Sequence, residues 1–153
     1  MAHFAEIDSN NKVLKVVVAC NQDIANNGGE QSAQAAKHFE SVLPLFSNGV
    51  KWVQTSYNNN IRKNFAAVGN IYSEEADVFY TSECEHASWT LDSNFDWQPP
   101  VAYPSTYVSP INGQNIITSW NEESQKWTGF AYDDDVNRVN FDWNPNTSTW
   151  DQV

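Results

Sequence analysis

The sequence predicts an α+β fold that is mostly β. Antiparallel hairpins pack with one short helix, and a small hairpin-rich C-terminal module follows a Pro-rich arm. Three observations support this. The apolar residues are largely aromatic, with seven Trp, six Tyr and eight Phe against one Met, and aromatic residues favour strands. Apolar residues recur about seven positions apart around turn-forming residues. Only one segment has the apolar spacing of a helix.

The N-terminal segment reads as a hairpin. Residues 3–7 alternate in polarity, residues 8–12 (DSNNK) have turn composition, and residues 13–18 (VLKVVV) form a β-branched run. Because this run is partly apolar on both faces, we expect it in the centre of a sheet.

Further strands are predicted downstream. Residues 51–57 alternate, the three asparagines of residues 58–60 form a turn, and residues 61–68 return as a strand. A small hairpin is expected over residues 72–79.

One helix is predicted over residues 30–42. Ala35, Ala36 and Phe39 fall on one face at helical spacing, and Pro44 limits the helix downstream. The preceding residues, 21–29, are polar and contain glycine, so they are expected to form a loop.

A repeated device dominates the C-terminal half: an apolar anchor, a polar turn and a second anchor. The Trp pairs are Trp89 and Trp97, Trp120 and Trp127, and Trp143 and Trp150. The first Trp pair is separated by eight positions and the other two by seven, as are Tyr72 with Phe79 and Ile7 with Leu14. Anchors on both sides of a tight turn fall on neighbouring strands, where aromatic pairs contribute about 0.2–1 kcal/mol each.

A Pro-rich segment suggests the domain boundary. Four prolines fall within residues 99–110, which predicts an extended, semi-rigid linker or arm. The predicted organisation is a compact α+β domain over residues 1–98, the arm over 99–110 and a small Trp-rich β module over 111–153. The module is small enough to need neighbours, from its own chain or another.

Charge is uneven along the chain, whose net charge is −11. Residues 1–63 hold six basic and five acidic residues, whereas residues 64–153 hold two basic and fourteen acidic ones. The acidity disfavours nucleic-acid binding, which needs basic contacts to phosphate. No apolar run is long enough to predict membrane insertion, and no secretory signal is visible. Lys51, Arg62 and Lys63 form a candidate docking face, and the acidic half is expected to face solvent or a neighbouring subunit.

The few potential metal ligands are poorly spaced. Cys20 ends an apolar run and is predicted to be buried, while Cys84 lies between acids that reduce thiol reactivity. Two free thiols are favoured over one disulfide. Cys84 and His86 lack a second ligand pair, so no structural zinc is predicted. The Asp133–Asp135 run lacks calcium-loop spacing, which favours a solvated turn, and no metal or cofactor is expected.

No residue set predicts an enzyme. The adjacent acids Glu122 and Glu123 cannot face each other across a cleft, and phosphate-loop, nucleophile-elbow and zinc-protease motifs are absent from the sequence. The tryptophans are the remaining candidates for a glycan-binding or protein-docking surface: Trp89, Trp97, Trp120, Trp127, Trp143 and Trp150. A role in the core is favoured, followed by docking to a partner protein.

Several segments together resemble a known family. They are residues 2–8 and 13–18, the block 54–69 (QTSYNNNIRKNFAAVG), residues 72–79, SWTLD at 88–92, WQPPVAYP at 97–104, and WNEESQKW at 120–127. These segments resemble small structural proteins of marine tailed phages, chiefly those infecting cyanobacteria. The chain departs from the family pattern in continuing through residues 133–153 and in having residues 83–86 (ECEH) where the family is richer in proline.

The resemblance implies a non-enzymatic virion protein made in the host cytoplasm, with no catalytic residues to carry over. Our leading hypothesis is a capsid decoration or cement protein that binds the major capsid lattice and stabilises it by mass action. Other virion proteins and self-association remain open as partners. The alternatives are a tail or tail-fibre accessory protein that contacts host surface glycan, and a carbohydrate-binding module.

Overall fold

The computed structural model describes residues 2–43, 45 and 48–153, and of Glu40 only the backbone. It confirms the predicted fold class, because antiparallel strands dominate and helices are few. The chain divides into two compact units, unit 1 (Met1–Glu83) and unit 2 (Cys84–Val153). Among the described residues, no helix has the length and apolar character needed to cross a membrane.

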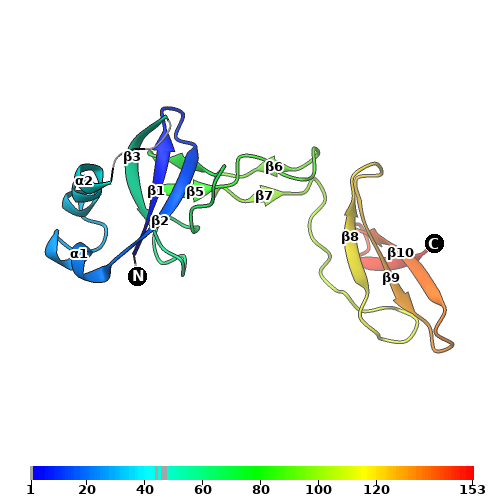
Figure 1. Cartoon of the computed structure of the whole chain (residues 1–153). Coiled ribbons are helices and arrows are strands. Elements are labelled where there is room, and N and C mark those ends of the chain that lie inside the picture. The colour runs from blue at the N-terminus through cyan, green and yellow to red at the C-terminus, as the bar shows by residue number, and fades with distance from the viewer. Residues whose placement is uncertain (1, 44, 46–47) are drawn as a thin grey trace. The chain divides into compact units, whose positions relative to one another are not determined.

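Unit 1 is organised around a three-stranded antiparallel sheet of β1 (Ala2–Asp8), β2 (Val13–Ala19) and β3 (Gly49–Thr55), shown in Figure 1. The strand order is β2-β1-β3, so β1 is central and the prediction of a central β2 was wrong. β1 buries side chains on both of its faces, among them Phe4, Ile7 and Glu6, whereas β2 leaves Val18 exposed. Gly49 is required beside Glu6, because a Cβ atom there would overlap the Glu6 carboxylate.

Two helices cover one face of this sheet. In α1 (Asn21–Asn26) and α2 (Ala33–Val42), the side chains of Ile24 and Phe39 pack with Phe4 and Trp52. The Ser32 side chain caps α2 by accepting a hydrogen bond from the Ala35 amide at 3.0 Å. The helix predicted over residues 30–42 is thus confirmed from residue 33, while Pro44 lies outside the described residues. The loop predicted over residues 21–29 was wrong in part, because buried Ile24 anchors α1 there.

The opposite face of the sheet packs against the hairpin of β4 (Ile71–Ser73) and β5 (Val78–Tyr80). Tyr72 and Phe79 pair across this hairpin as predicted, and their rings lie 5.0 Å apart. The strand predicted over residues 61–68 was wrong. Arg62 and Lys63 have φ values of 56° and 62°, and two successive left-handed residues cannot continue a strand.

Unit 2 contains a short hairpin and a four-stranded sheet. The hairpin joins β6 (Thr90–Leu91) and β7 (Trp97–Gln98). The sheet contains β8 (Ile117–Asn121), β9 (Lys126–Tyr132), β10 (Arg138–Asn144) and β11 (Thr149–Gln152), in the order β11-β10-β9-β8. Trp120 pairs with Trp127 and Trp143 with Trp150, as their spacing predicts, whereas Trp97 pairs with Leu91 and not with Trp89.

The Pro-rich segment lies against the sheet of unit 2. The indole N–H of Trp127 donates to the Val101 carbonyl at 3.0 Å, and that of Trp150 donates to the Thr106 carbonyl at 2.8 Å. Pro104 is buried. The structure therefore differs from the predicted arm and from a boundary at residue 98. The division falls between Glu83 and Cys84, because Trp89 and Val101 pack on the tryptophan core.

Candidate interaction surfaces

The structure uses two of the three predicted docking residues to hold unit 1 together. The Lys51 ammonium pairs with Glu74 at 2.5 Å. The Arg62 Nε atom pairs with Asp77 at 2.7 Å, and its Nη1 atom donates to the Gln54 carbonyl at 3.1 Å. These carboxylates offset the charges of Lys51 and Arg62. Arg62, with 15% of its side chain exposed, acts mainly as a clamp between the loop and the sheet.

The loop that contains Arg62 and Lys63 has a rigid, strained backbone. Within residues 56–66, here called the pinned loop, Asn59, Arg62 and Lys63 all have positive φ. The Asn59 side chain accepts a hydrogen bond from the Phe65 amide at 2.7 Å, and the Thr55 hydroxyl accepts one from the Ala66 amide at 2.8 Å. Such strain persists only where surrounding contacts over-determine it, and it is frequent at binding sites.

The pinned loop presents aromatic side chains. The rings of His3 and Phe65 lie 5.2 Å apart, and those of Tyr57 and Phe65 lie 5.6 Å apart. Tyr57 is 72% exposed. A polar cavity of about 180 Å³ adjoins the loop, with Gln54 and Thr55 in its lining. Sequence analysis missed this surface because it assigned residues 61–68 to a strand.

Four of the six candidate tryptophans form the core of unit 2. Trp120, Trp127, Trp143 and Trp150 are at most 8% exposed, which excludes them as a glycan-binding face in this fold. Trp89 is half-buried, and its ring lies 6.1 Å from that of Trp127. The structure thus places these four residues in the core role that sequence analysis favoured.

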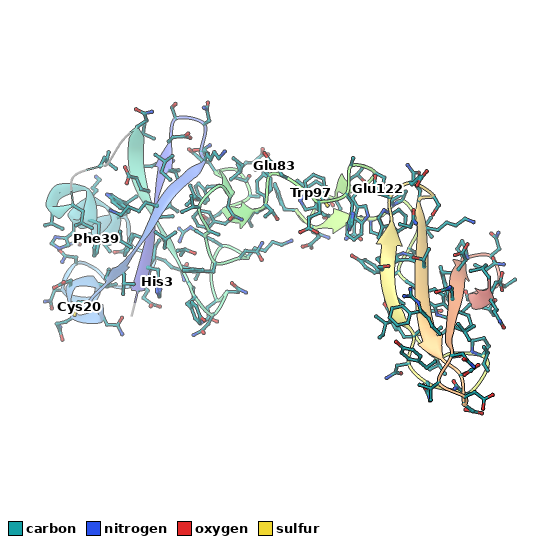
Figure 2. The ribbon with its side chains drawn as sticks, turned by 45° about the vertical axis from the view of Figure 1, so that its right-hand side comes forward. His3, Cys20, Phe39, Glu83, Trp97 and Glu122 are labelled. Carbon is teal, nitrogen blue, oxygen red and sulfur yellow. The ribbon has the colours of Figure 1, made fainter. Side chains whose placement is uncertain are left out.

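Trp97 and Trp89 remain partly exposed. Figure 2 shows Trp97 on the short hairpin β6–β7. The Trp89 indole nitrogen is buried and has no hydrogen-bond partner among the described residues. Its ring packs against His86 at 4.9 Å and against Tyr103 at 6.0 Å.

Glu122 joins the start of unit 2 to the β8–β9 hairpin. Its Oε1 atom accepts a hydrogen bond from the Ser88 amide at 2.7 Å, and its Oε2 atom accepts from the Ser88 hydroxyl and the Trp120 indole, each at 2.9 Å. Partial desolvation of the Glu122 carboxylate opposes ionisation, but these hydrogen bonds and the nearby His86 lower its pKa. The carboxylate is therefore engaged as a structural acceptor.

The acidic run Asp133–Asp135 forms a turn. One Asp133 carboxylate oxygen accepts hydrogen bonds from the amides of Asp135 and Asn137, at 3.0 and 2.8 Å. These bonds, led by the Asn137 amide, lower the pKa of Asp133. The turns that begin at Asp8 and Asp92 repeat the same two hydrogen bonds. Among the described residues, no group of three potential ligands is placed to hold a metal ion.

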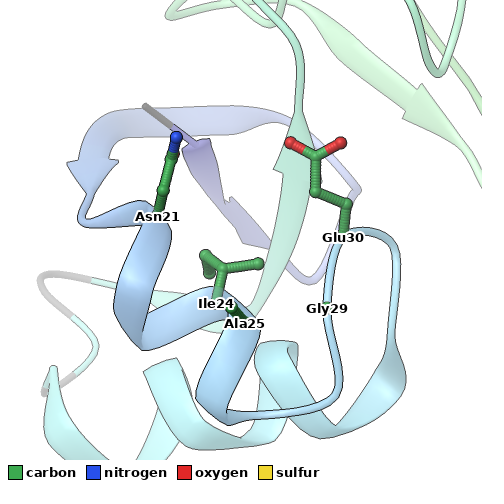
Figure 3. A pocket seen from close by; sticks show the side chains of 5 residues that line it. All are labelled: Asn21, Ile24, Ala25, Gly29 and Glu30. Atoms are coloured by element: carbon green, nitrogen blue, oxygen red, sulfur yellow. The ribbon is translucent and has the colours of Figure 1, made fainter.

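The remaining candidates show no reactive arrangement. Cys20, labelled in Figure 2, is exposed, so the prediction that it is buried was wrong. It follows Ala19, the last core residue of β2, and lies at the N-cap of α1. Both cysteine thiols are free. Figure 3 shows a shallow cavity beside α1, where Asn21 and Glu30 stand on either side of Ile24. Glu30 is its one ionisable lining residue among those described, so this cavity offers no acid–base pair.

Comparison of the chain with protein-family models, curated proteins and solved structures found no match. The resemblance to phage virion proteins therefore stays a hypothesis that rests on the segments quoted for it.

Proposed function

We propose that this chain is a non-enzymatic structural protein of a phage virion, and specifically a capsid decoration protein that binds the major capsid lattice. The observation that carries the proposal is the pinned loop, which holds the exposed Tyr57 near the rings of His3 and Phe65 in a segment that also contains Lys63. Aromatic and basic side chains on a rigid support are typical of protein-docking surfaces.

Three carboxylates are engaged in stabilising the fold. Glu122 and Asp133 accept hydrogen bonds that stabilise turns and hairpins, and Asp77 holds Arg62. These groups serve the fold. Because Lys51 and Arg62 pair with carboxylates within unit 1, the docking surface that we propose centres on Lys63 and on Tyr57, the most exposed aromatic residue of the pinned loop.

The test is co-sedimentation of the full chain with purified, expanded capsids from which the protein is absent. We expect saturable binding by the wild-type chain. Tyr57→Ser should reduce capsid occupancy by about tenfold, because aromatic anchors dominate interface energetics. Lys63→Glu should reduce it less, since a charge at the rim of an interface contributes less than a buried anchor.

Lys12→Glu is the matched control for Lys63→Glu. It makes the same change of charge at the turn between β1 and β2, at the other end of the sheet from the pinned loop. Its occupancy should equal that of the wild type. Failure of the wild-type chain to bind capsids would refute the decoration role, while equal loss in the Lys63 and Lys12 variants would show that the pinned loop is not the docking surface.

A further inference from the structure

The sheet of unit 2 has one covered face and one open face. Trp120, Trp127 and Trp143 point into the core, and the residues alternating with them lie on the opposite face. This opposite face, here called the open face, contains a groove of about 290 Å³. That volume is just below the usual range for small-molecule sites, about 300–1,000 Å³. The groove runs across β8, β9 and β10.

The groove is lined by hydrogen-bonding side chains, by the Phe130 ring and by the side-chain carboxylate of Asp142, which lies opposite Thr128. Ser119 and Thr128 are cross-strand neighbours whose hydroxyl oxygens lie 3.5 Å apart. Asn140 lies on β10, opposite Phe130 of β9. Hydroxyl and amide groups both donate and accept hydrogen bonds, as a ligand rich in hydroxyl groups requires. The Phe130 ring adds an apolar surface within the same groove.

Arg138 lies in this groove in a fixed position. Its guanidinium carbon lies 4.0 Å from the centre of the Phe130 ring, and its Nε atom donates to the Asn140 side chain at 3.1 Å. Among the described residues, no carboxylate pairs with Arg138, whereas the other cation of unit 2, Lys126, pairs with Asp142 at 3.6 Å. Stacking on an aromatic ring pre-organises a guanidinium for two-point recognition of a carboxylate.

The surrounding charge makes the position of Arg138 selective. Unit 2 contains ten acidic residues and only these two basic ones. An anionic ligand is repelled by most of such a surface, including the Asp142 carboxylate, and it is attracted to the Arg138 guanidinium in the same groove. The ligand must therefore carry enough hydrogen-bonding groups to compensate for the repulsion.

We infer that the open face of unit 2 binds an acidic saccharide, a sugar whose carboxylate pairs with Arg138. The sugar hydroxyls bond to Ser119, Thr128 and Asn140. The bidentate pairing of guanidinium with carboxylate supplies the charge-assisted contact, and the rigid sheet holds the polar groups in register. This inference does not depend on the decoration role.

The experiment is an NMR titration of the isotope-labelled full chain with tetragalacturonate, with maltotetraose and acetate as separate probes. We expect tetragalacturonate to shift the amide signals of β8, β9 and β10 with a Kd of about 1 mM. Arg138→Gln should weaken this binding by about tenfold, because it removes a charge-assisted pair. Thr128→Val, which keeps the shape and the preference for strand, should weaken it by about threefold.

Lys37→Gln is the matched control, because it removes one positive charge from α2 of unit 1, outside the groove. It should change the Kd by less than about twofold. Equal affinity for maltotetraose would overturn the role of the carboxylate. Shifts of the same size with acetate would show adventitious anion binding only, and an absence of shifts on the open face would overturn the site. Unaltered amide signals elsewhere in the Arg138 and Thr128 variants verify that both remain folded.

Discussion

The two units use aromatic residues differently. Unit 1 buries both faces of its sheet, one under helices and one under the β4–β5 hairpin, and its clusters contain a single tryptophan, Trp52. Unit 2 buries one face of its sheet, and Trp120, Trp127, Trp143 and Trp150 supply most of that core. The same device of an aromatic pair across a hairpin is therefore a covering element in unit 1 and the core itself in unit 2.

The difference follows from the size of each unit and from whether helices cover its sheet. A unit without helices has little apolar surface to lay on its sheet, so each buried side chain must be large. The tryptophans also provide indole N–H groups, which hold the covering segment through the carbonyls of Val101 and Thr106. In unit 1, helices provide this cover with small residues such as Ala35. Unit 2 leaves one broad face of its sheet uncovered.

The largest expected effect is from truncation of a core tryptophan. Trp127→Ala should destabilise unit 2 by about 3–5 kcal/mol, because it leaves a cavity and an unpaired Val101 carbonyl. Two-dimensional NMR of the full chain should show loss of the dispersed signals of unit 2 while those of unit 1 remain, since the core clusters of the two units share no residue.

Trp52→Ala is the reciprocal change. It should disrupt the signals of unit 1 and leave those of unit 2 in place, because Trp52 is 2% exposed within the helix-covered core. If either substitution abolished the signals of both units together, the chain would fold as one cooperative body and the comparison would fail.

The spacing of apolar residues in the sequence predicted the hairpins well. Trp120 lies directly opposite Trp127, and Trp143 lies directly opposite Trp150. A separation of seven positions leaves room for one tight turn between two paired residues. The same argument was wrong for Trp89, which precedes β6, and for Leu14, which does not pair with Ile7. A β-bulge after Glu6 pairs Ile7 with Val13. Spacing predicts a register only where the ladder is regular.

The other features of the fold depend on packing between segments that are distant in the sequence. β1 is central although its sequence reads as ordinary alternation, because Ala2, Ala5 and Glu6 are buried by segments far along the chain. No local pattern distinguishes a tryptophan that faces a core from one that faces solvent. The groove with Arg138 and Phe130 likewise forms only when β9 and β10 pair, so neither residue was a candidate from sequence alone.

A smaller effect is expected from substitutions in a type of turn that occurs in both units. Val136 is a β-branched residue with a φ of 63° and is 76% exposed, so its backbone strain is not offset by packing of its side chain. Val136→Gly should stabilise unit 2 by about 1 kcal/mol, measured by urea denaturation followed through signals of unit 2. The equivalent residue of the first turn in unit 1 is Asn11, with a φ of 61°. Asn11→Gly should change stability by less than about 0.5 kcal/mol, because asparagine tolerates this geometry. Equal effects at the two positions would show that the strain at Val136 is relieved in solution.

The smallest effects are expected from changes of pH. Alkaline pH should destabilise unit 1, and acidic pH should destabilise unit 2. In unit 1, burial of Tyr72 and its hydrogen bond to Asp77 raise the pKa of the phenol above 10.0. The neutral phenol thus stabilises unit 1 fully below pH 10, and this contribution is lost as the pH rises through the raised pKa. Thermal unfolding should show the alkaline loss in unit 1, and Tyr72→Phe should remove its pH dependence.

In unit 2 the sign is reversed, because the pKa of Glu122 lies below its ordinary value of 4.5. The ionised carboxylate accepts hydrogen bonds from Ser88 and Trp120, so its contribution is present above pH 4.5 and is lost as the pH falls through the lowered pKa. The carboxylate is exposed, so the effect should be modest and should weaken further at high salt. Glu122→Gln should make the melting temperature of unit 2 less sensitive to acid while leaving the alkaline response of unit 1 intact. A variant that altered both responses would show that the titrations of Glu122 and Tyr72 are coupled, and the two units could then no longer be treated as separate.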